Sequence, residues 1–220
     1  MTATARGLRI LVGLTLIAVA FAMTVRAHLG LGPWHVLQQG LSLRTGLSLG
    51  LAGVITNSAL FLAAVVLRER PGLGTLAAVG LGSGLLDVVL PLVPTPAAMP
   101  ARLAFLIVGI IVMSGGAALY ISADLGAAPL DAVMTGIYRR VPWSLSRVRL
   151  SLELLGLALG LAAGGEVGIG CAVVGLGIGP GIQAWLRLLK AMPVKLVERE
   201  ISGGPAAAEP VLPARSTSLV

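Results

Sequence analysis

The chain has 220 residues, of which 56% are hydrophobic and only 11% are charged. A soluble domain has about 25% charged residues, so this composition excludes an ordinary water-soluble domain and indicates an integral membrane protein. The 16 basic and 9 acidic residues are scattered between apolar runs, which argues against nucleic-acid binding.

The chain offers few residues for catalysis or metal binding. It has one cysteine, Cys171, and two histidines, His28 and His35, neither with a metal-ligand partner nearby in the sequence. Metalloprotease, phosphate-loop and serine-hydrolase motifs are absent from the sequence. We therefore expect neither an enzyme nor a bound metal or cofactor.

Six apolar segments are long enough to cross a bilayer as helices, which takes about 20 residues. With both termini in the cytoplasm, 13 of the 16 basic residues lie on the inner side, in agreement with the positive-inside rule. The sequence thus predicts an all-α transmembrane bundle of six spans. A disordered cytoplasmic tail is predicted for 196–220, where Pro, Gly, Ser and Ala occur without periodicity. The predicted spans are 8–26, 49–67, 73–93, 102–121, 147–163 and 167–189.

The two halves of the chain resemble each other at a shift of 96 residues. The matches include arginine, proline and glycine, which coincide by chance less often than leucine in so apolar a chain. After residue 74 the phase becomes ambiguous, because a glycine series matches at a shift of 95 instead. The matched residues are Arg6 with Arg102, Gly13 with Gly109, Leu29-Gly30 with Leu125-Gly126, Pro33 with Pro129, Gly40 with Gly136, Arg44 with Arg140, and Gly72 and Gly74 with Gly168 and Gly170; at the shift of 95, Gly80, Gly82 and Gly84 match Gly175, Gly177 and Gly179.

These matches predict two repeats, 1–98 and 99–195, each with three spans. Because three is odd, the second repeat must cross the membrane in the opposite sense to the first. Inverted repeats of this kind are common in transporters, with the working site at their interface. Duplication is also a simple way to build any helical bundle, so a role without transport stays open.

Each repeat contains a short segment with a glycine turn followed by proline, at 29–43 and 125–138. Pro33 and Pro129 suit the first position of a helix, and the runs that follow are too short to span. The start of a helix binds anionic or polar groups, which makes His35 and Asp131 further candidates. The segments are either re-entrant half-helices at a binding site or amphipathic helices in the two membrane interfaces.

Four polar residues lie inside the predicted spans, where an ionisable group is costly and normally faces protein or water. The shift of 96 pairs Asn57 with Glu153 and Asp87 with Gln183. In an inverted bundle these side chains are expected to converge near the midplane. The competing interpretation is structural: Glu153 pairs with Arg149 four residues earlier, and the two amides join helices by hydrogen bonds.

Several of these motifs resemble the YczE/YyaS/YitT-type family of bacterial integral membrane proteins. The motifs are Gly30-Leu-Gly-Pro-Trp-His-Val-Leu-Gln-Gln-Gly40, Gly46-Leu-Ser-Leu-Gly50, Pro71-Gly-Leu-Gly-Thr75 and Ala123-Asp-Leu-Gly-Ala-Ala-Pro-Leu-Asp131 with Trp143-Ser144 and Glu153. The resemblance covers about residues 6–190 and implies a polytopic protein of the bacterial cytoplasmic (inner) membrane, without implying a substrate. His35 stands where this family usually has aspartate, whereas the second copy keeps Asp131.

Together these features predict a protein that transports or binds a small polar or anionic solute without an ATPase of its own. The alternatives are an accessory membrane protein that docks a partner, and the substrate-binding subunit of a multi-protein importer. Its expected partners are the lipid bilayer, the solute, and either a second copy or another membrane protein, but no nucleic acid. The candidate solute-binding residues are Pro33, His35, Asn57, Asp87, Pro129, Asp131, Glu153 and Gln183.

Overall fold

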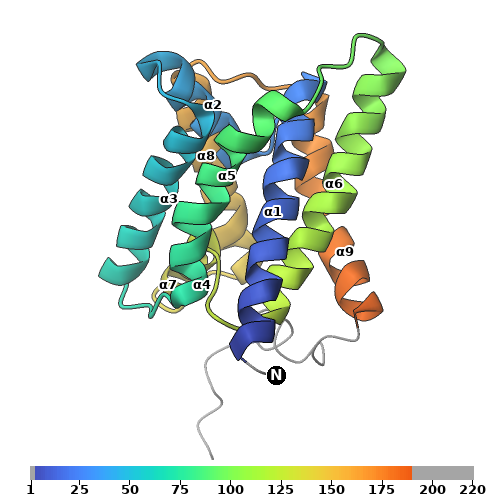
Figure 1. Ribbon diagram of the computed structural model, residues 1–220. Coiled ribbons are helices and arrows are strands. Elements are labelled where there is room, and N and C mark those ends of the chain that lie inside the picture. The colour runs from blue at the N-terminus through green and yellow to red at the C-terminus, as the bar shows by residue number, and fades with distance from the viewer. Residues whose placement is uncertain (1–2, 190–220) are drawn as a thin grey trace, which may run out of the picture.

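The computed structural model describes residues 3–189. Helices are the regular structure throughout this range, with no strand, which confirms the predicted all-α class (Figure 1). The predicted tail at 196–220 and the last residues of the second predicted repeat lie outside the described residues. The elements are α1 (Ala3–Ala27), α2 (Pro33–Thr45), α3 (Leu49–Val66), α4 (Leu73–Ala77), η1 (Ala78–Gly82), α5 (Ser83–Val89), η2 (Leu90–Leu92), α6 (Met99–Ser122), α7 (Pro129–Tyr138), α8 (Leu145–Ala162) and α9 (Ile169–Leu188).

Within the described residues, five helical stretches are long and apolar enough to cross a membrane. They are Thr4–Ala27, Leu49–Val66, Leu73–Leu92, Met99–Ser122 and Ile169–Leu188. Their apolar faces are open: Ile169 and Leu176 on α9 are 79% and 78% exposed, as expected for side chains that face lipid. The fifth predicted span, 147–163, corresponds to α8, which is interrupted by three charged residues, Arg147, Arg149 and Glu153.

The third of these stretches is not a regular α-helix. Between α4 and α5 it widens into one π-helical turn, η1, and it ends in a 3₁₀ turn, η2. A π-turn holds one more residue than an α-turn between the same hydrogen-bonded groups. The corresponding stretch in the second half, α9, is a continuous α-helix that contains Pro180.

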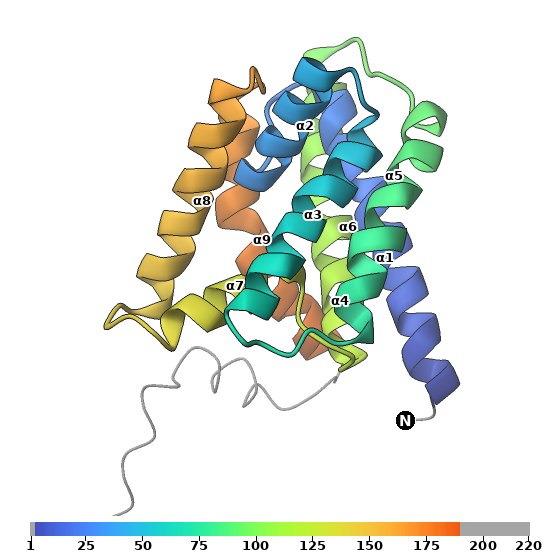
Figure 2. The same cartoon turned by 90° about the vertical axis from the view of Figure 1, so that its left-hand side faces the viewer.

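The centre of the fold is the contact between α1 and α6, which lie side by side (Figures 1 and 2). Glycine brings their backbones together: a Cβ on Gly13 would lie 2.8 Å from the carbonyl oxygen of Gly116. In the same way, a Cβ on Gly109 would lie 3.2 Å from the oxygen of Ala20. These two contacts are related by the shift of 96 residues. Small residues at a helix crossing are typical of membrane bundles, where close packing replaces the hydrophobic effect.

Other contacts between the two halves are also related by the shift of 96 residues. The short helix α2 packs on α8, and the short helix α7 packs on α3. The Gly74 N–H donates to the carbonyl of Leu125 (2.8 Å), and the Gly170 N–H donates to that of Leu29 (2.7 Å). The two hydrogen bonds join matching residues, because Gly74 corresponds to Gly170 and Leu125 to Leu29 at the shift of 96 residues. Figure 2 shows α2 towards one end of the bundle and α7 towards the other.

The start of α3 is held by a carboxylate from the neighbouring helix α5. The side chain of Ser48 accepts a hydrogen bond from the Leu51 N–H (3.2 Å) and donates its hydroxyl proton to Asp87. Asp87 also accepts from the Gly50 N–H (2.8 Å). The first N–H groups of a helix lack partners within the helix, so Asp87 supplies an acceptor that α3 needs.

Gly170→Ala should destabilise the protein, because a Cβ here would lie 2.4 Å from the carbonyl oxygen of Gly30. Relieving the clash separates the backbones and weakens the bond from Gly170 to Leu29. We expect a loss of about 1–3 kcal/mol, the usual cost of overpacking. It should appear as a lower thermal unfolding temperature of the purified protein in detergent.

The matched control is Gly179→Ala on the same helix, where a Cβ would meet no atom within 4 Å outside its own stretch of helix. Alanine favours a helix over glycine by about 0.8–1.0 kcal/mol, so this variant should unfold at the parental temperature or above it. Equal destabilisation by the two substitutions would contradict the close contact at Gly170.

Asp87→Ala should lower the unfolding temperature by removing the acceptor for Ser48 and Gly50. Hydrogen bonds to charged groups contribute about 1.5–3 kcal/mol, and the partial exposure of this site favours the lower end. Asp87→Asn retains one acceptor oxygen and should lose less. An unchanged unfolding temperature in both variants would show that Asp87 does not stabilise the start of α3.

Candidate functional site

A cavity of about 300 Å³ lies between the two halves of the chain. Long helices from both halves form its walls, and the first residues of α2 and of α7 both reach it. Its volume lies at the lower end of the range for small-molecule sites, about 300–1,000 Å³. Most of the wall is apolar, and a few polar side chains interrupt it. This arrangement fits a small organic solute better than a bare ion.

The cavity is bounded on one side by the start of α2. Gly32 is the extended N-cap residue (φ −61°, ψ 155°), and Pro33 takes the first helical position, as the sequence predicts. In this geometry the N–H groups of Trp34 and His35 have no acceptor within the helix. The His35 ring stacks on Phe21 of α1, with ring centroids 3.8 Å apart.

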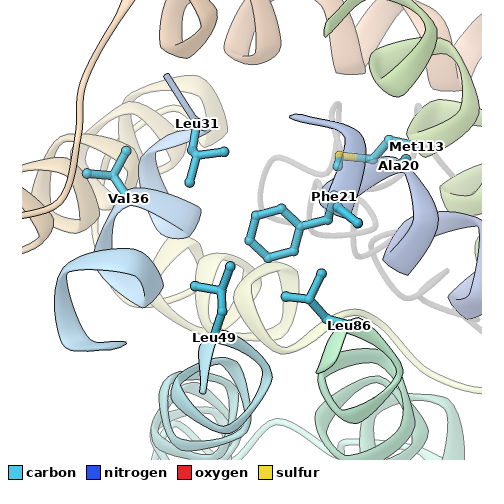
Figure 3. Packing of buried hydrophobic residues seen from close by; sticks show 8 residues of the cluster. Ala20, Phe21, Leu31, Val36, Leu49, Leu86 and Met113 are labelled. Carbon is cyan, nitrogen blue, oxygen red and sulfur yellow. The ribbon is translucent and has the colours of Figure 1, made fainter. Parts of the chain in front are cut away.

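Phe21 links this wall to the hydrophobic core. Figure 3 shows its ring projecting from α1 among Leu31, Leu49 and Leu86, which come from three other parts of the chain. The side chains of Phe21, Leu31, Leu49 and Leu86 are all at least nine-tenths buried. The stacked position of His35 is therefore fixed by packing rather than by a charged partner.

The start of α7 bounds the cavity on the other side with nearly the same backbone geometry. Ala128 is the extended N-cap residue (φ −62°, ψ 152°), and Pro129 takes the first helical position. Ala128, Pro129 and Leu130 line the cavity, whereas Asp131 does not. Asp131 is the acidic residue in the first turn of α7.

Helix α8 contributes an ion pair to the wall. The Arg149 Nε–H donates to Oε1 of Glu153 at 3.1 Å, and both residues line the cavity. Glu153 is the less exposed partner, at 26% against 53% for Arg149. The local ion pair that the sequence offered as an alternative is therefore formed, and it lies at the predicted site.

Amide and hydroxyl groups occupy the wall formed by α3 and α5. Asn57 Nδ2 donates to Ser83 Oγ at 3.0 Å, which joins the two helices. Gln38 of α2 is buried beside them and also lines the cavity. Asn57 thus makes the interhelical hydrogen bond expected from its position in an apolar span, and it faces the cavity as well.

The structure brings together most, but not all, of the residues singled out from the sequence. Asp87 accepts hydrogen bonds at the start of α3 and does not line the cavity. Asp131 does not line the cavity either. Gln183 is exposed on α9 and does not reach the cavity. The predicted residues that line the cavity are Pro33, His35, Asn57, Pro129 and Glu153.

Sequence reasoning missed two aromatic residues of the wall. The indole of Trp34 packs on Gly156 of α8, where a Cβ would lie 3.1 Å from the ring. Tyr120 of α6 is only 6% exposed. Trp34 Nε1 and the Tyr120 hydroxyl are buried without a hydrogen-bond partner among the described residues. For Tyr120, the signal in the sequence was a tyrosine inside a predicted apolar span. The polar side chains of Gln38 and Ser83 gave weaker signals that these residues line a site.

The chain matches the profile of a family described as "Family of unknown function (DUF6198)" over residues 4–187. It is 33% identical over 184 residues to an uncharacterized protein of Haemophilus influenzae, an alignment that covers 84% of each chain. It is 26% identical over 160 residues to the "Uncharacterized membrane protein YczE" of Bacillus subtilis, covering 72% of this chain and 74% of that one. It is also 26% identical over 166 residues to the "Uncharacterized protein YyaS" of the same organism, covering 72% and 81%.

No solved structure matches the chain. The matches to YczE and YyaS confirm the resemblance that the glycine-proline motifs indicated. Together with the five long apolar helices among the described residues, they identify a membrane protein in contact with lipid. The chain belongs to the DUF6198 family of membrane proteins, for which no function is established.

Proposed function

We propose that this protein binds and transports a small polar or anionic solute across the bacterial cytoplasmic membrane, without an ATPase of its own and without chemical conversion. One observation carries the proposal: the starts of both short helices meet polar side chains of α3 and α8 at a single cavity. Helix starts present unpaired N–H groups and a positive partial charge, which suit a polar or anionic group.

The proposed architecture is two inverted repeats of three spans, 1–98 and 99–195, with both termini in the cytoplasm. The recurrence of contacts under the 96-residue shift supports it, as does the position of α2 and α7 at opposite ends of the bundle. In this arrangement α8 is the fifth span, in addition to the five helical stretches that are long and apolar enough by themselves. The pairing of Arg149 with Glu153 lowers the cost of placing two charges within it.

We favour re-entrant half-helices over helices that lie in the membrane interfaces. The support comes from burial: Val36, Gln38 and Gly40 of α2 are buried against protein, and so are Pro129, Ala132 and Val133 of α7. Irregular backbone at membrane depth is stable only where protein covers it or where it lines a cavity. The loops before α2 and α7 satisfy this condition through their contacts with Gly170 and Gly74.

Transport requires that the cavity open to one side at a time. In the proposed mechanism the bonds Gly74–Leu125 and Gly170–Leu29 lie at the two ends of the bundle and open alternately. Gly30 and Gly126, next to these bonds, adopt positive φ values of 101° and 128°, which only glycine tolerates readily.

Cysteine labelling tests this proposal in full-length protein in which Cys171 is replaced by serine. Single cysteines at two exposed positions report topology: Thr45, the last residue of α2, and Pro142, in the loop after α7. A membrane-impermeant thiol reagent should label position 45 only from outside and position 142 only from inside. His35→Cys, in the cavity wall, should also be labelled from water. Leu62→Cys, 63% exposed but facing lipid, should not.

Labelling of positions 45 and 142 from the same side would overturn the inverted repeat. No labelling at position 35, in protein whose loop cysteines react, would indicate a sealed core and favour the accessory-protein alternative. Co-purification separates the remaining alternatives: an importer subunit should carry ATPase subunits with it. A docking role for the basic inner face is less favoured, because Arg139 pairs with Glu69 at 3.4 Å and Arg140 donates to the carbonyls of Gly136 and Leu67.

A further inference from the structure

We propose that the solute is a zwitterion of amino-acid size, with one carboxylate, one ammonium group and an apolar side group. The inference rests on the proposed function, because it names the class of solute for the same cavity.

The charged residues at the cavity provide no excess of positive charge. Arg149 and Glu153 are the basic and acidic residues that line the wall among the described residues. One guanidinium therefore faces one carboxylate. A simple anion would enter without a cation to balance it, and an unbalanced charge in a protein interior is costly. A zwitterion brings one positive and one negative charge, so it leaves the net charge at the cavity unchanged.

The ion pair on α8 offers one partner for each charge of a zwitterion. Among the described residues, it is joined by a single hydrogen bond, between Arg149 Nε and Glu153 Oε1. The two terminal nitrogens of Arg149 remain for a carboxylate, which guanidinium groups bind through paired hydrogen bonds. Oε2 of Glu153 remains for an ammonium group.

The two short helices reinforce these opposite preferences. The first turn of α2 contains no acidic residue, so the N–H groups of Trp34 and His35 can support a carboxylate. The first turn of α7 contains Asp131, which offsets the positive end of that helix and favours a cation. His35 and Asp131 are equivalent positions under the 96-residue shift. The difference between them makes the start of α2 the better of the two helix starts for a carboxylate.

An unsatisfied side chain supports the presence of a ligand. Tyr120 is 94% buried, lines the cavity, and its hydroxyl has no partner among the described residues. Buried hydroxyls nearly always have a partner, because leaving one without costs about 1–3 kcal/mol. A small zwitterion in the cavity would bring polar atoms to this region, while Phe21 and Leu86 would pack on its side group.

Thermal unfolding of the full chain in lipid nanodiscs tests the proposal with three probes that share one side group. L-leucine has both charges, 4-methylpentanoate lacks the ammonium group, and 3-methylbutylamine lacks the carboxylate. Leucine should raise the unfolding temperature at concentrations at least tenfold lower than either analogue. L-phenylalanine, 3-phenylpropanoate and 2-phenylethylamine repeat the comparison with a larger side group.

Variants of α8 connect this effect to the cavity. Arg149→Gln and Glu153→Gln should each weaken the effect of leucine at least tenfold. Arg147 and Glu166 carry the same charges but do not line the cavity. Arg147→Gln and Glu166→Gln should therefore leave the effect of leucine unchanged. The exchange Arg149→Glu with Glu153→Arg retains an ion pair, so it should unfold like the parent yet respond weakly to leucine.

Each remaining outcome has a definite meaning. Equal effects of leucine and 4-methylpentanoate would overturn the zwitterion and leave a solute that is simply an anion. Loss of the stabilising effect of leucine in Arg147→Gln or Glu166→Gln would also overturn the proposal of a zwitterion in this cavity. If no probe has an effect while position 35 is labelled from water, a zwitterion of this size is excluded and the proposed function stands. If position 35 is also inaccessible, the proposed function fails as well.

Discussion

The loops before α2 and α7 are irregular backbone that neighbouring helices cover closely, and the rest of this structure depends on that cover. The loops before α2 and α7 are covered by the starts of α9 and α4, at contacts so close that only glycine fits. A Cβ on Gly72 would lie 2.1 Å from the Leu125 oxygen, and one on Gly168 would lie 2.3 Å from the Leu29 oxygen. These contacts hold both short helices with their first residues at one cavity.

The cavity combines a rigid apolar frame with polar groups that are only partly satisfied. Phe21 and its neighbours fix the frame, since they are packed on all sides. The polar groups differ in how fully they are used: Asn57 and Ser83 bond to each other, whereas Glu153 uses one of its two oxygens. Sites for small molecules commonly have this composition, with apolar walls for affinity and a few polar atoms for orientation.

The sequence was most informative where a local rule acts. Gly-Pro turns predicted the starts of α2 and α7 at Pro33 and Pro129, and the four-residue spacing on one helix predicted the Arg149–Glu153 pair. Tyr120 was not predictable as a wall residue, because its position depends on how α1 and α6 pack. The predicted segment 29–43 also stopped short of the end of α2, which continues to Thr45 before the left-handed Gly46.

The π-helical turn η1 explains why the internal match changes from 96 to 95 residues. Between Gly74 and Gly80 the first half has six steps, whereas the second half has five between Gly170 and Gly175. The wider turn at Ala78–Gly82 absorbs this single inserted residue without breaking the helix. Beyond it the shift of 95 pairs Asp87 with Ile182, whereas the shift of 96 pairs it with Gln183. The two halves therefore differ outside the cavity: Asp87 anchors the start of α3 in one half, whereas Ile182 has a hydrocarbon side chain at the matching position of the other.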